Sequence, residues 1–522
     1  MTTNGRFASS PANGGETKGG GNHLLIVGTG FAGLGMAIRL KQRGIHSFTV
    51  LEQEGDVGGT WRDNSYPGAA CDVESHLYSF SFEPHAGWSH MFARQTEIWE
   101  YLRRCVDKYN LRSHIRFGAK VKGASFDKQT GLWSVALANG ETLEARAIVS
   151  GCGGLSRPSV PNIPGLDGFT GHAFHSARWD HNYSLEGRRV AVVGTGASSV
   201  QIVPEIAKVA KHLYVFQRTP PWIVPRPDRL IEVSEKELFA RFRVTQEFVR
   251  RRIFLKRELA TFGFTAAPQL LRLGEFFARR HLHGSVSDPE LRRKLTPDYR
   301  LGCKRILLSN DYYSTLTRPN VSLVTEAVEQ VRGSAIVGKS GTSAEVDALI
   351  LCTGFQASDD CAPFDIRGVD GQSLIEEWAP GAQAYVGTVV SGFPNLFVIV
   401  GPNTGLGSNS MVLMIESQID FILQAVEMLH SNNVKYLDVL PDVQRNYNEH
   451  IQKRLANTVW NSGCKSWYQT ASGKNTTLWP GTTTEFRRRA RFNPLDFKIV
   501  TEAGSPLKNA AHHSILPAFL RP

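Results

Sequence analysis

Cysteine is scarce in this chain: 7 of 522 residues are cysteine, and none lies in a Cys-x-x-Cys pair. The absence of such pairs excludes a zinc ribbon and a dithiol redox centre, and isolated thiols favour a reducing cytoplasm. Cys352 and Cys361 are near enough in sequence to meet, but we expect two free buried thiols there.

Long apolar runs are also missing. The first 22 residues are rich in Gly, Ser, Thr and Asn and lack the apolar core of a signal peptide, so residues 1–22 predict a disordered lead-in. Four glycines interrupt the apolar run 24–38, which therefore predicts a strand, a turn and a helix instead of a membrane span. We expect no membrane partner and a cytoplasmic location.

The charge balance is basic, with 59 Lys and Arg against 48 Asp and Glu and a net charge of +11. The basic residues are dispersed, apart from short clusters at 250–252 and 487–489. Solvated helix faces and sites for anionic dinucleotides account for this excess, so we expect no nucleic-acid partner. A length of 522 residues indicates two or three domains.

A glycine-rich turn follows the first predicted strand. Residues 28–33 read Gly-Thr-Gly-Phe-Ala-Gly, between the strand 23–28 and a predicted helix. Such glycines allow a tight turn and close approach of a pyrophosphate to the helix N-terminus. A second strand, 47–51, ends at Glu52, which lies 52 − 30 = 22 residues after Gly30. A carboxylate at this spacing accepts bonds from ribose hydroxyls, which favours FAD. The turn residues predicted to bind it are Gly28, Gly30, Phe31 and Gly33.

A second turn, Gly-Thr-Gly-Ala-Ser-Ser at 194–199, follows another predicted strand at 189. Arg218 lies 218 − 196 = 22 residues after Gly196, where the first unit has a carboxylate. An arginine there can bind a 2′-phosphate, so the second site favours NADPH. The alternative is that Arg218 is a solvated charge at a strand end. Ser199 replaces the third glycine of the motif.

The order of these elements predicts an α/β fold with two dinucleotide-binding, Rossmann-like domains and a helical insertion in the second. The apolar spacing of Leu238, Phe242, Phe248, Ile253 and Leu259 indicates the helices of this insertion. The predicted segments are 23–150 (FAD domain, first part), 151–180 (linker), 181–229 (NADPH domain, first part), 230–297 (insertion), 298–385 (NADPH domain, second part) and 386–522 (FAD domain, second part, and tail).

Two longer patterns carry a family resemblance. Residues 169–180 fill F-x-G-x-x-x-H-x-x-x-W-(P/D) with Phe169, Gly171, His175, Trp179 and Asp180. Residues 59–72 fit G-x-W-x-x-x-x-(F/Y)-P-(G/M)-x-x-x-D. The chain resembles the type I Baeyer–Villiger monooxygenases, class B flavoprotein monooxygenases that depend on FAD and NADPH. The resemblance extends from about residue 23 into the C-terminal region.

The resemblance implies roles for individual residues. It implies flavin contacts at Glu52, Thr60, Trp61, Arg62, Asp63, Ala70, Cys71, Asp72, Tyr78, Val121 and Met411. It implies NADPH contacts at Thr195, Gly196, Ala197, Ser198, Ser199, Val200, Gln201, Arg218, Thr219, Lys304 and Arg305. Arg305 matches the family's catalytic arginine, and Asp72 matches its acidic neighbour.

The implied reaction inserts one oxygen atom of O₂ next to a ketone carbonyl and gives an ester or lactone. NADPH reduces FAD, and the flavin C4a-peroxide then attacks the ketone to form a Criegee intermediate. A permanent positive charge at Arg305 favours the anionic peroxide and the developing oxyanion, and Asp72 holds the arginine in place.

Other assignments are less specific. His175 is either a structural histidine or, with Trp179, couples domain rotation to the redox state. Trp467 either closes over substrate and nicotinamide or packs in the core. The rival functions are a flavin-containing N- or S-oxygenating monooxygenase and a nucleotide-binding sensor without turnover. The expected partners are a small ketone and O₂, and we expect a monomer or dimer.

Overall fold

The structure is a computed structural model that describes residues 23–356, 362–431, 433–464 and 466–502. The predicted lead-in of residues 1–22 lies outside the described residues. So does Cys361, so the expectation of two free buried thiols can be followed only at Cys352, which is buried and free.

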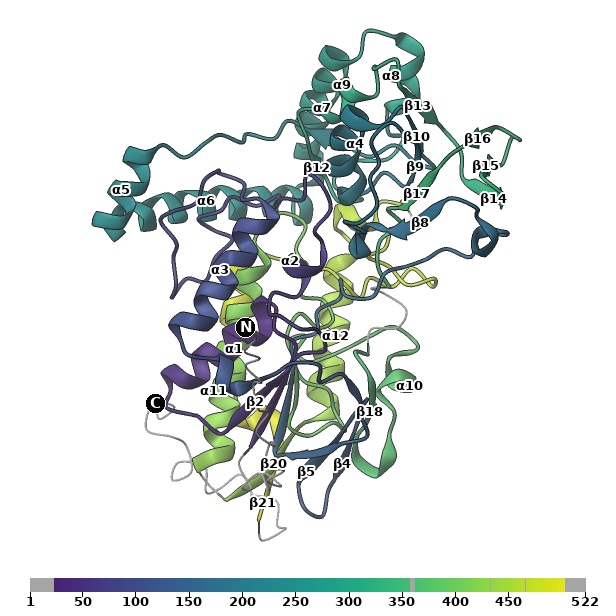
Figure 1. Cartoon of the computed structure of the whole chain (residues 1–522). Helices are drawn as coiled ribbons and strands as arrows, with labels where there is room; N and C mark the ends of the chain where they lie inside the picture. Colours follow the sequence, from purple (N-terminus) through teal and green to yellow (C-terminus); the bar gives the residue numbers. More distant parts are fainter. Residues whose placement is uncertain (1–22, 357–361, 432, 465, 503–522) are drawn as a thin grey trace, which may run out of the picture.

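Five parallel strands form the first sheet, in the order β19-β7-β1-β2-β3 (Figure 1). These strands are Leu396–Val398, Ala147–Ser150, Leu24–Val27, Phe48–Leu51 and Ile115–Arg116. Every residue of β1 and β7 is buried, as expected for parallel strands covered on both faces. The helices α1 (Phe31–Gln42) and α11 (Met411–Ser431) pack against each other beside this sheet.

A second parallel sheet has the order β13-β10-β9-β17-β8. These strands are Val321–Val324, His212–Phe216, Arg189–Val193, Ala348–Leu351 and His172–His175. The helix α4 (Ala197–Val209) connects β9 to β10, which completes a second βαβ unit. The predicted α/β class with two Rossmann-like units is therefore confirmed.

Smaller sheets accompany the two parallel ones. Beside the first, β4 (Val121–Asp127), β5 (Leu132–Leu137) and β6 (Thr142–Ala145) form an antiparallel meander. Beside the second, β14 (Val328–Arg332), β15 (Ala335–Gly338) and β16 (Ser343–Glu345) do the same. β18 (Asp365–Arg367) pairs with β4, so the chain has returned to the flavin side before the boundary predicted at residue 385.

The insertion is helical and consists of α5 (Val233–Arg241), α6 (Arg243–Thr265), α7 (Leu271–Ser285) and α8 (Pro289–Leu295). In Figure 1, α5 and α6 form an arm that reaches from the second sheet across the flavin side, above α3 (Gln95–Lys108). Of the apolar residues that indicated these helices, Ile253 is buried, whereas Phe248 and Leu259 are 65% and 76% exposed.

The predicted linker 151–180 is only partly a connection. Its residues 172–175 form β8, the edge strand of the second sheet, which pairs with β17. The signature residues in and after β8 therefore belong to the nicotinamide side, and backbone freedom between the sheets is left to the segment before residue 172.

The remaining elements are short or lie outside the two main sheets. They are α2 (Thr60–Asp63), α9 (Tyr312–Thr315), α10 (Leu374–Trp378), α12 (Pro441–Leu455), α13 (Thr483–Arg489), β11 (Ile223–Val224), β12 (Leu307–Leu308), β20 (Val434–Val439) and β21 (Phe497–Thr501). Within the described part of the chain, no helix has the length and apolar character that crossing a bilayer requires.

Candidate active site

The first glycine turn leaves no room for side chains. A Cβ at Gly33 would lie 1.9 Å from the Gly28 carbonyl oxygen, and Gly28 itself has a φ of +99°. On the open side of the turn, a Cβ at Gly59 would lie 3.0 Å from the Gly30 Cα. No side chain caps the N-terminus of α1, so its first N–H groups remain available to a phosphate. This cradle fits the pyrophosphate of FAD.

Glu52 lies at the end of β2 beside this turn and is 4% exposed. Its carboxylate accepts hydrogen bonds from the backbone N–H of Thr29 at 3.1 Å and from the Thr29 hydroxyl. Arg62 Nη1 lies 3.1 Å from its other oxygen, Oε1. These contacts hold the Glu52 side chain in place where a ribose is expected.

Predicted flavin contacts from three segments gather near this turn. Trp61 Nε1 donates to the Tyr78 hydroxyl at 3.1 Å, and Tyr78 packs edge-on against Phe31 at 5.2 Å between ring centroids. Burial raises the pKa of Tyr78 well above its ordinary range. Met411 begins α11, whereas Val121 is buried in β4, in the same apolar cluster as Val27 and Leu51.

The second glycine turn has the same features as the first, namely a tightly packed glycine and an uncapped helix N-terminus. A Cβ at Gly194 would lie 2.4 Å from the Cys352 carbonyl oxygen. Thr195 Oγ1 donates to the Thr219 carbonyl at 3.0 Å, which joins the turn to the end of β10. Ser199 is fully buried, and its hydroxyl has no hydrogen-bond partner among the described residues. A free N-terminus of α4 and an unpartnered hydroxyl fit a bound nicotinamide dinucleotide.

Arg218 and Lys304 lie close enough to repel each other. Burial, and then the charge of Arg218, lower the pKa of Lys304. Asp298 acts on Lys304 in the opposite direction, but the pKa of Lys304 is still lowered. Two cations held near one another favour an anionic ligand, and a 2′-phosphate meets that requirement. This proximity weighs against the alternative that Arg218 is only a solvated strand-end charge.

Gln201 links the two cofactor regions. Its Nε2 donates to the Ala70 carbonyl at 2.9 Å, and its Oε1 accepts from the Tyr66 hydroxyl at 3.0 Å. Because Gln201 lies in α4 and Ala70 directly precedes Cys71 and Asp72, the flavin-side segment is fastened to the nicotinamide-side helix.

Arg305 and Asp72 meet between the two turns. Nε and Nη2 of Arg305 donate to Asp72 Oδ2 at 3.1 and 2.5 Å. The side chains remain 39% and 31% exposed, so the pair is accessible from solvent. The charge of Asp72 raises the pKa of Arg305, and burial opposes this. Burial also opposes ionisation of Asp72, but Arg305 offsets it and lowers the pKa of the carboxyl.

A disulfide joins Cys303 to Cys464, with their Cα atoms 6.2 Å apart. The sequence did not predict this pair, because the two cysteines are 161 residues apart and no local spacing connects them. The disulfide fastens the residue next to Lys304 to the loop that carries Trp467.

The loop after Cys464 places two aromatic residues near the arginine. Trp467 is 45% exposed, so packing in the core is excluded for it. Tyr468 is 1% exposed and close enough to Arg305 and Asp72 to interact electrostatically with both. Burial raises the pKa of Tyr468 to about 12, so its hydroxyl is neutral. Residues 466–468 resemble the family's substrate-side loop in sequence, but that resemblance did not predict that Tyr468 interacts with Arg305.

The signature stretch connects the two sides. A Cβ at Gly171 would lie 2.6 Å from both the Asp347 carbonyl oxygen and the Phe169 ring, which explains the glycine. After β8, Arg178 Nη1 lies 3.8 Å from Asp63 Oδ2, and the hydroxyl of Ser65 lies 2.7 Å from His181 Nε2. The two fingerprint stretches thus contact each other.

His175, Trp179 and Asp180 have distinct surroundings. His175 Nδ1 accepts from the Ala177 N–H at 3.1 Å, and the ring also interacts with the backbone of Gly354. Burial lowers the pKa of His175, so the ring is neutral. Trp179 packs edge-on against Phe174 at 5.0 Å between centroids, and Asp180 lies 2.9 Å from His172.

One contact to the site comes from the insertion and was missed from sequence. Arg257 of α6 donates to Glu74 Oε2 at 2.8 and 2.5 Å and to the backbone carbonyl of Asp72 at 3.3 Å. Glu74 is 5% exposed. An arginine in a charge-rich helix carries no sequence signal for this role.

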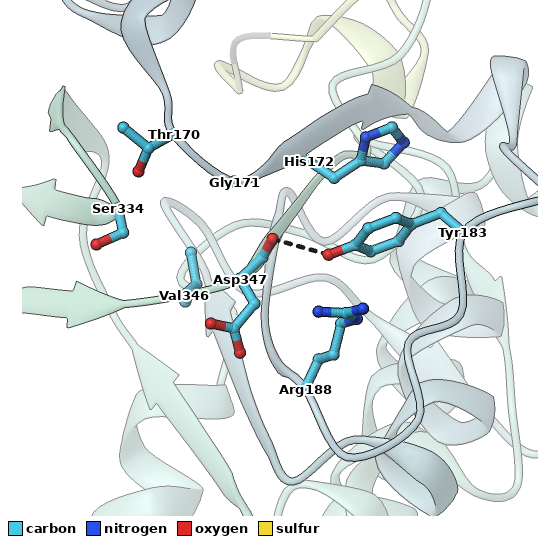
Figure 2. A pocket seen from close by; sticks show the side chains of 8 residues that line it. All are labelled: Thr170, Gly171, His172, Tyr183, Arg188, Ser334, Val346 and Asp347. Atoms are coloured by element: carbon cyan, nitrogen blue, oxygen red, sulfur yellow. Dashed lines mark hydrogen bonds between the residues drawn. The ribbon is translucent and has the colours of Figure 1, made fainter.

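A cavity of about 390 Å³ lies elsewhere on the nicotinamide side (Figure 2). Its lining includes His172 and Arg188, which lie on opposite faces of the Tyr183 ring, and Tyr183 donates to the Asp347 carbonyl at 3.1 Å. These residues precede or begin β8, β9 and β17, whereas the cofactor turns follow strand ends. Ligands of such sheets bind at the carboxyl ends, so this cavity is not the cofactor site.

Fold and site together define a flavoprotein with two dinucleotide sites and an arginine–aspartate pair between them. Comparison with known proteins agrees. Residues 21–364 match the family model "Flavin-binding monooxygenase-like". A Baeyer–Villiger monooxygenase of Pseudomonas aeruginosa is 48% identical over 94% of this chain and 93% of its own length. One from Streptomyces coelicolor is 49% identical over 90% of each chain.

Solved structures are similar throughout the fold. A closed cyclohexanone monooxygenase gives a TM-score of 0.82 at 29% identity, covering 92% of this chain and 99% of its own. A steroid monooxygenase bound to NADP gives 0.79 at 31% identity, covering 90% and 96%. The chain belongs to the Baeyer–Villiger monooxygenases of the flavin-binding monooxygenase-like family. It is an NADPH-dependent flavin monooxygenase, and its cofactors are FAD and NADPH.

Proposed function

We propose that the enzyme inserts one oxygen atom of O₂ beside the carbonyl of a small, largely apolar ketone and releases an ester or lactone. The observation that carries this proposal is the Arg305–Asp72 pair, held between the two nucleotide turns and open to solvent. The bound flavin and nicotinamide supply the electrons and activate oxygen.

Arg305 supplies a charge that does not titrate. Its raised pKa keeps the guanidinium positive at every working pH, and such a charge stabilises the negative charge that develops on the ketone oxygen. Asp72 fixes the orientation of the guanidinium by occupying Nε and Nη2. Tyr468 and the exposed Trp467 are proposed to cover the substrate and to exclude water.

Arg218 and Lys304 are proposed to bind the 2′-phosphate together. The other residues for which the resemblance implies FAD or NADPH contacts are proposed to bind those cofactors. His175 and Trp179 are proposed as coupling residues, because the stretch that contains them contacts Asp63 and Ser65 of the flavin side. This role does not require proton transfer to the substrate.

The competing function is oxygenation of nitrogen or sulfur. The Asp72–Arg305 pair supports the ketone reaction instead, because N- and S-oxygenation develops no carbonyl oxyanion that needs such a charge. We further propose a cytoplasmic enzyme, where NADPH is supplied, that acts as a monomer or dimer. The Cys303–Cys464 disulfide argues against this location, because disulfides are rare in a reducing compartment.

The test is a panel of linear, cyclic and aryl ketones together with an amine and a sulfide. NADPH consumption and the identity of each product are measured in the same reaction. Ester or lactone formed in proportion to NADPH supports the proposal. NADPH consumption with N-oxide or sulfoxide as the only organic product would contradict it.

A further inference from the structure

Exposed apolar side chains are concentrated in the helical insertion. Of the 19 large hydrophobic residues that are exposed in the described chain, 13 lie between Leu230 and Phe277. Monomeric proteins rarely expose large contiguous apolar patches, and such patches mark interaction sites. Neither cofactor binding nor the proposed reaction accounts for this surface.

Five of these residues form a row along α6, here called the α6 stripe. Val244, Phe248, Leu255, Leu259 and Phe262 are 73%, 65%, 58%, 76% and 54% exposed. At 3.6 residues per turn, the five fall within about 60° of arc and extend over about 27 Å. The stripe is therefore one continuous face and not a scatter of single residues.

The opposite face of α6 is fixed to the flavin side. Arg250 donates to the His76 carbonyl at 2.7 Å, and Arg257 binds Glu74. Ile253 and Phe264 on this face are buried. The helix thus cannot turn its stripe inward without breaking these contacts, and the stripe stays directed to solvent.

The steps between the first four residues of the stripe are the same whether the helix is followed from its N-terminus or from its C-terminus. From Val244, the steps to Phe248, Leu255 and Leu259 are four, seven and four residues. If two α6 helices pair antiparallel about a two-fold axis between residues 251 and 252, Val244 faces Leu259 and Phe248 faces Leu255 of the second copy. A two-fold interface requires this self-complementarity.

The axis brings Arg251 and Arg252 of the two copies near each other. On its own helix Glu247 lies 3.1 Å from Arg251, and this pairing offsets part of the repulsion. The long stems of the arginines also let their charges reach solvent.

We propose that the α6 stripe is the interface of a homodimer, with two α6 helices antiparallel about an axis between Arg251 and Arg252. Five side chains of this size expose on the order of 500 Å². Apolar neighbours on α5 and α7 extend the face toward the roughly 800 Å² per partner of a standard interface. An acidic lipid surface is the rival occupant, but it does not require the symmetric spacing.

Sedimentation velocity of the full chain with FAD tests the interface. The unchanged protein should be a dimer. Phe248→Glu should raise the dimer Kd at least about 100-fold, because two charges then face Leu255 side chains, with FAD content and Tm unchanged. Leu495→Glu is the matched control, since Leu495 is 60% exposed outside the insertion, and it should remain dimeric.

The register is tested separately. Phe248→Cys and Leu255→Cys chains should form a disulfide with each other when mixed, but neither with itself. Like positions on the two copies are separated by about 10 Å of helix rise, which exceeds the reach of a disulfide.

Three results would overturn the proposal. One is a monomer at every concentration up to the solubility limit. Another is a dimer that survives Phe248→Glu. The third is flotation of a monomeric protein with phosphatidylserine vesicles, lost in Phe248→Glu and weakened by salt, which would assign the stripe to a membrane. A dimer held by the stripe should instead strengthen with salt, because salt screens the arginines at the axis.

Discussion

Asp72 holds Arg305 through a single oxygen, Oδ2, which accepts from both Nε and Nη2. The two residues are 233 positions apart in the sequence and come from opposite cofactor sides. Nη1 of Arg305 has no hydrogen-bond partner among the described residues. One edge of the guanidinium is therefore fixed by Asp72, and Nη1 remains available for a further hydrogen bond.

Arg305→Ala should retain FAD and NADPH-driven flavin reduction while ester formation falls about 10²- to 10³-fold. Hydride delivery does not need a charge at this position, whereas the developing oxyanion does. Stopped-flow reduction and product analysis measure the two steps separately. Arg318→Ala, an exposed arginine in the same half, is the control. Ester formation within a few-fold of the parent would assign the role to another residue.

Arg218→Ala should raise the KM for NADPH about 10- to 100-fold and leave the KM for NADH nearly unchanged. The loss reflects a missing partner of the 2′-phosphate, which NADH does not have. Steady-state kinetics with both nucleotides measure this difference. Lys208→Ala, at the far end of α4, should change neither value. Equal kcat/KM for the two nucleotides in the unchanged enzyme would contradict the assignment.

Arg257→Gln should lower the free energy of unfolding by about 3 kcal/mol, because it leaves the buried Glu74 without its closest partner. It should also reduce ester formed per NADPH, since the Asp72 segment loses its support. The double variant Arg257→Gln, Glu74→Gln should recover part of the stability. Arg243→Gln, at the exposed start of the same helix, should cost under about 0.5 kcal/mol. Additive effects of the two changes would show that the pair is not coupled.

Asp438 predicts a pH dependence of stability. Burial raises its pKa from 3.8 to about 6, against a hydrogen bond from the Gly392 N–H. Between these values the unfolded chain loses a proton that the folded chain keeps, so stability present below pH 3.8 is lost as pH rises through about 6. Asp438→Asn should then stabilise the protein above pH 6 by up to about 3 kcal/mol and change little in acid. Denaturant titrations in acid and above pH 6 measure the free energy of unfolding at the two pH values. The exposed Asp442→Asn is the control. Equal stabilisation by Asp438→Asn at both pH values would contradict the assignment.

Local patterns predicted the parts of the fold that depend on neighbours in sequence. The spacing from Gly30 to Glu52, and from Gly196 to Arg218, reflects one βαβ unit, and the structure has both units. The pairing of Asp72 with Arg305 came from family resemblance, because no spacing rule joins them. Arg257 was missed for the same reason, and so was the interaction of Tyr468 with Arg305, since tertiary packing alone brings these residues to the site. For α6 the periodicity predicted a helix but not which apolar side chains would face solvent.

The Cys303–Cys464 disulfide closes a covalent ring that includes β13, β17, α11 and α12. A protease that cuts an exposed loop inside this ring produces two pieces that stay attached to each other. They would separate on a denaturing gel only after a thiol is added. The ring also contains Arg305 and Met411, so a nicked enzyme would still carry residues of both cofactor sides in one covalent molecule.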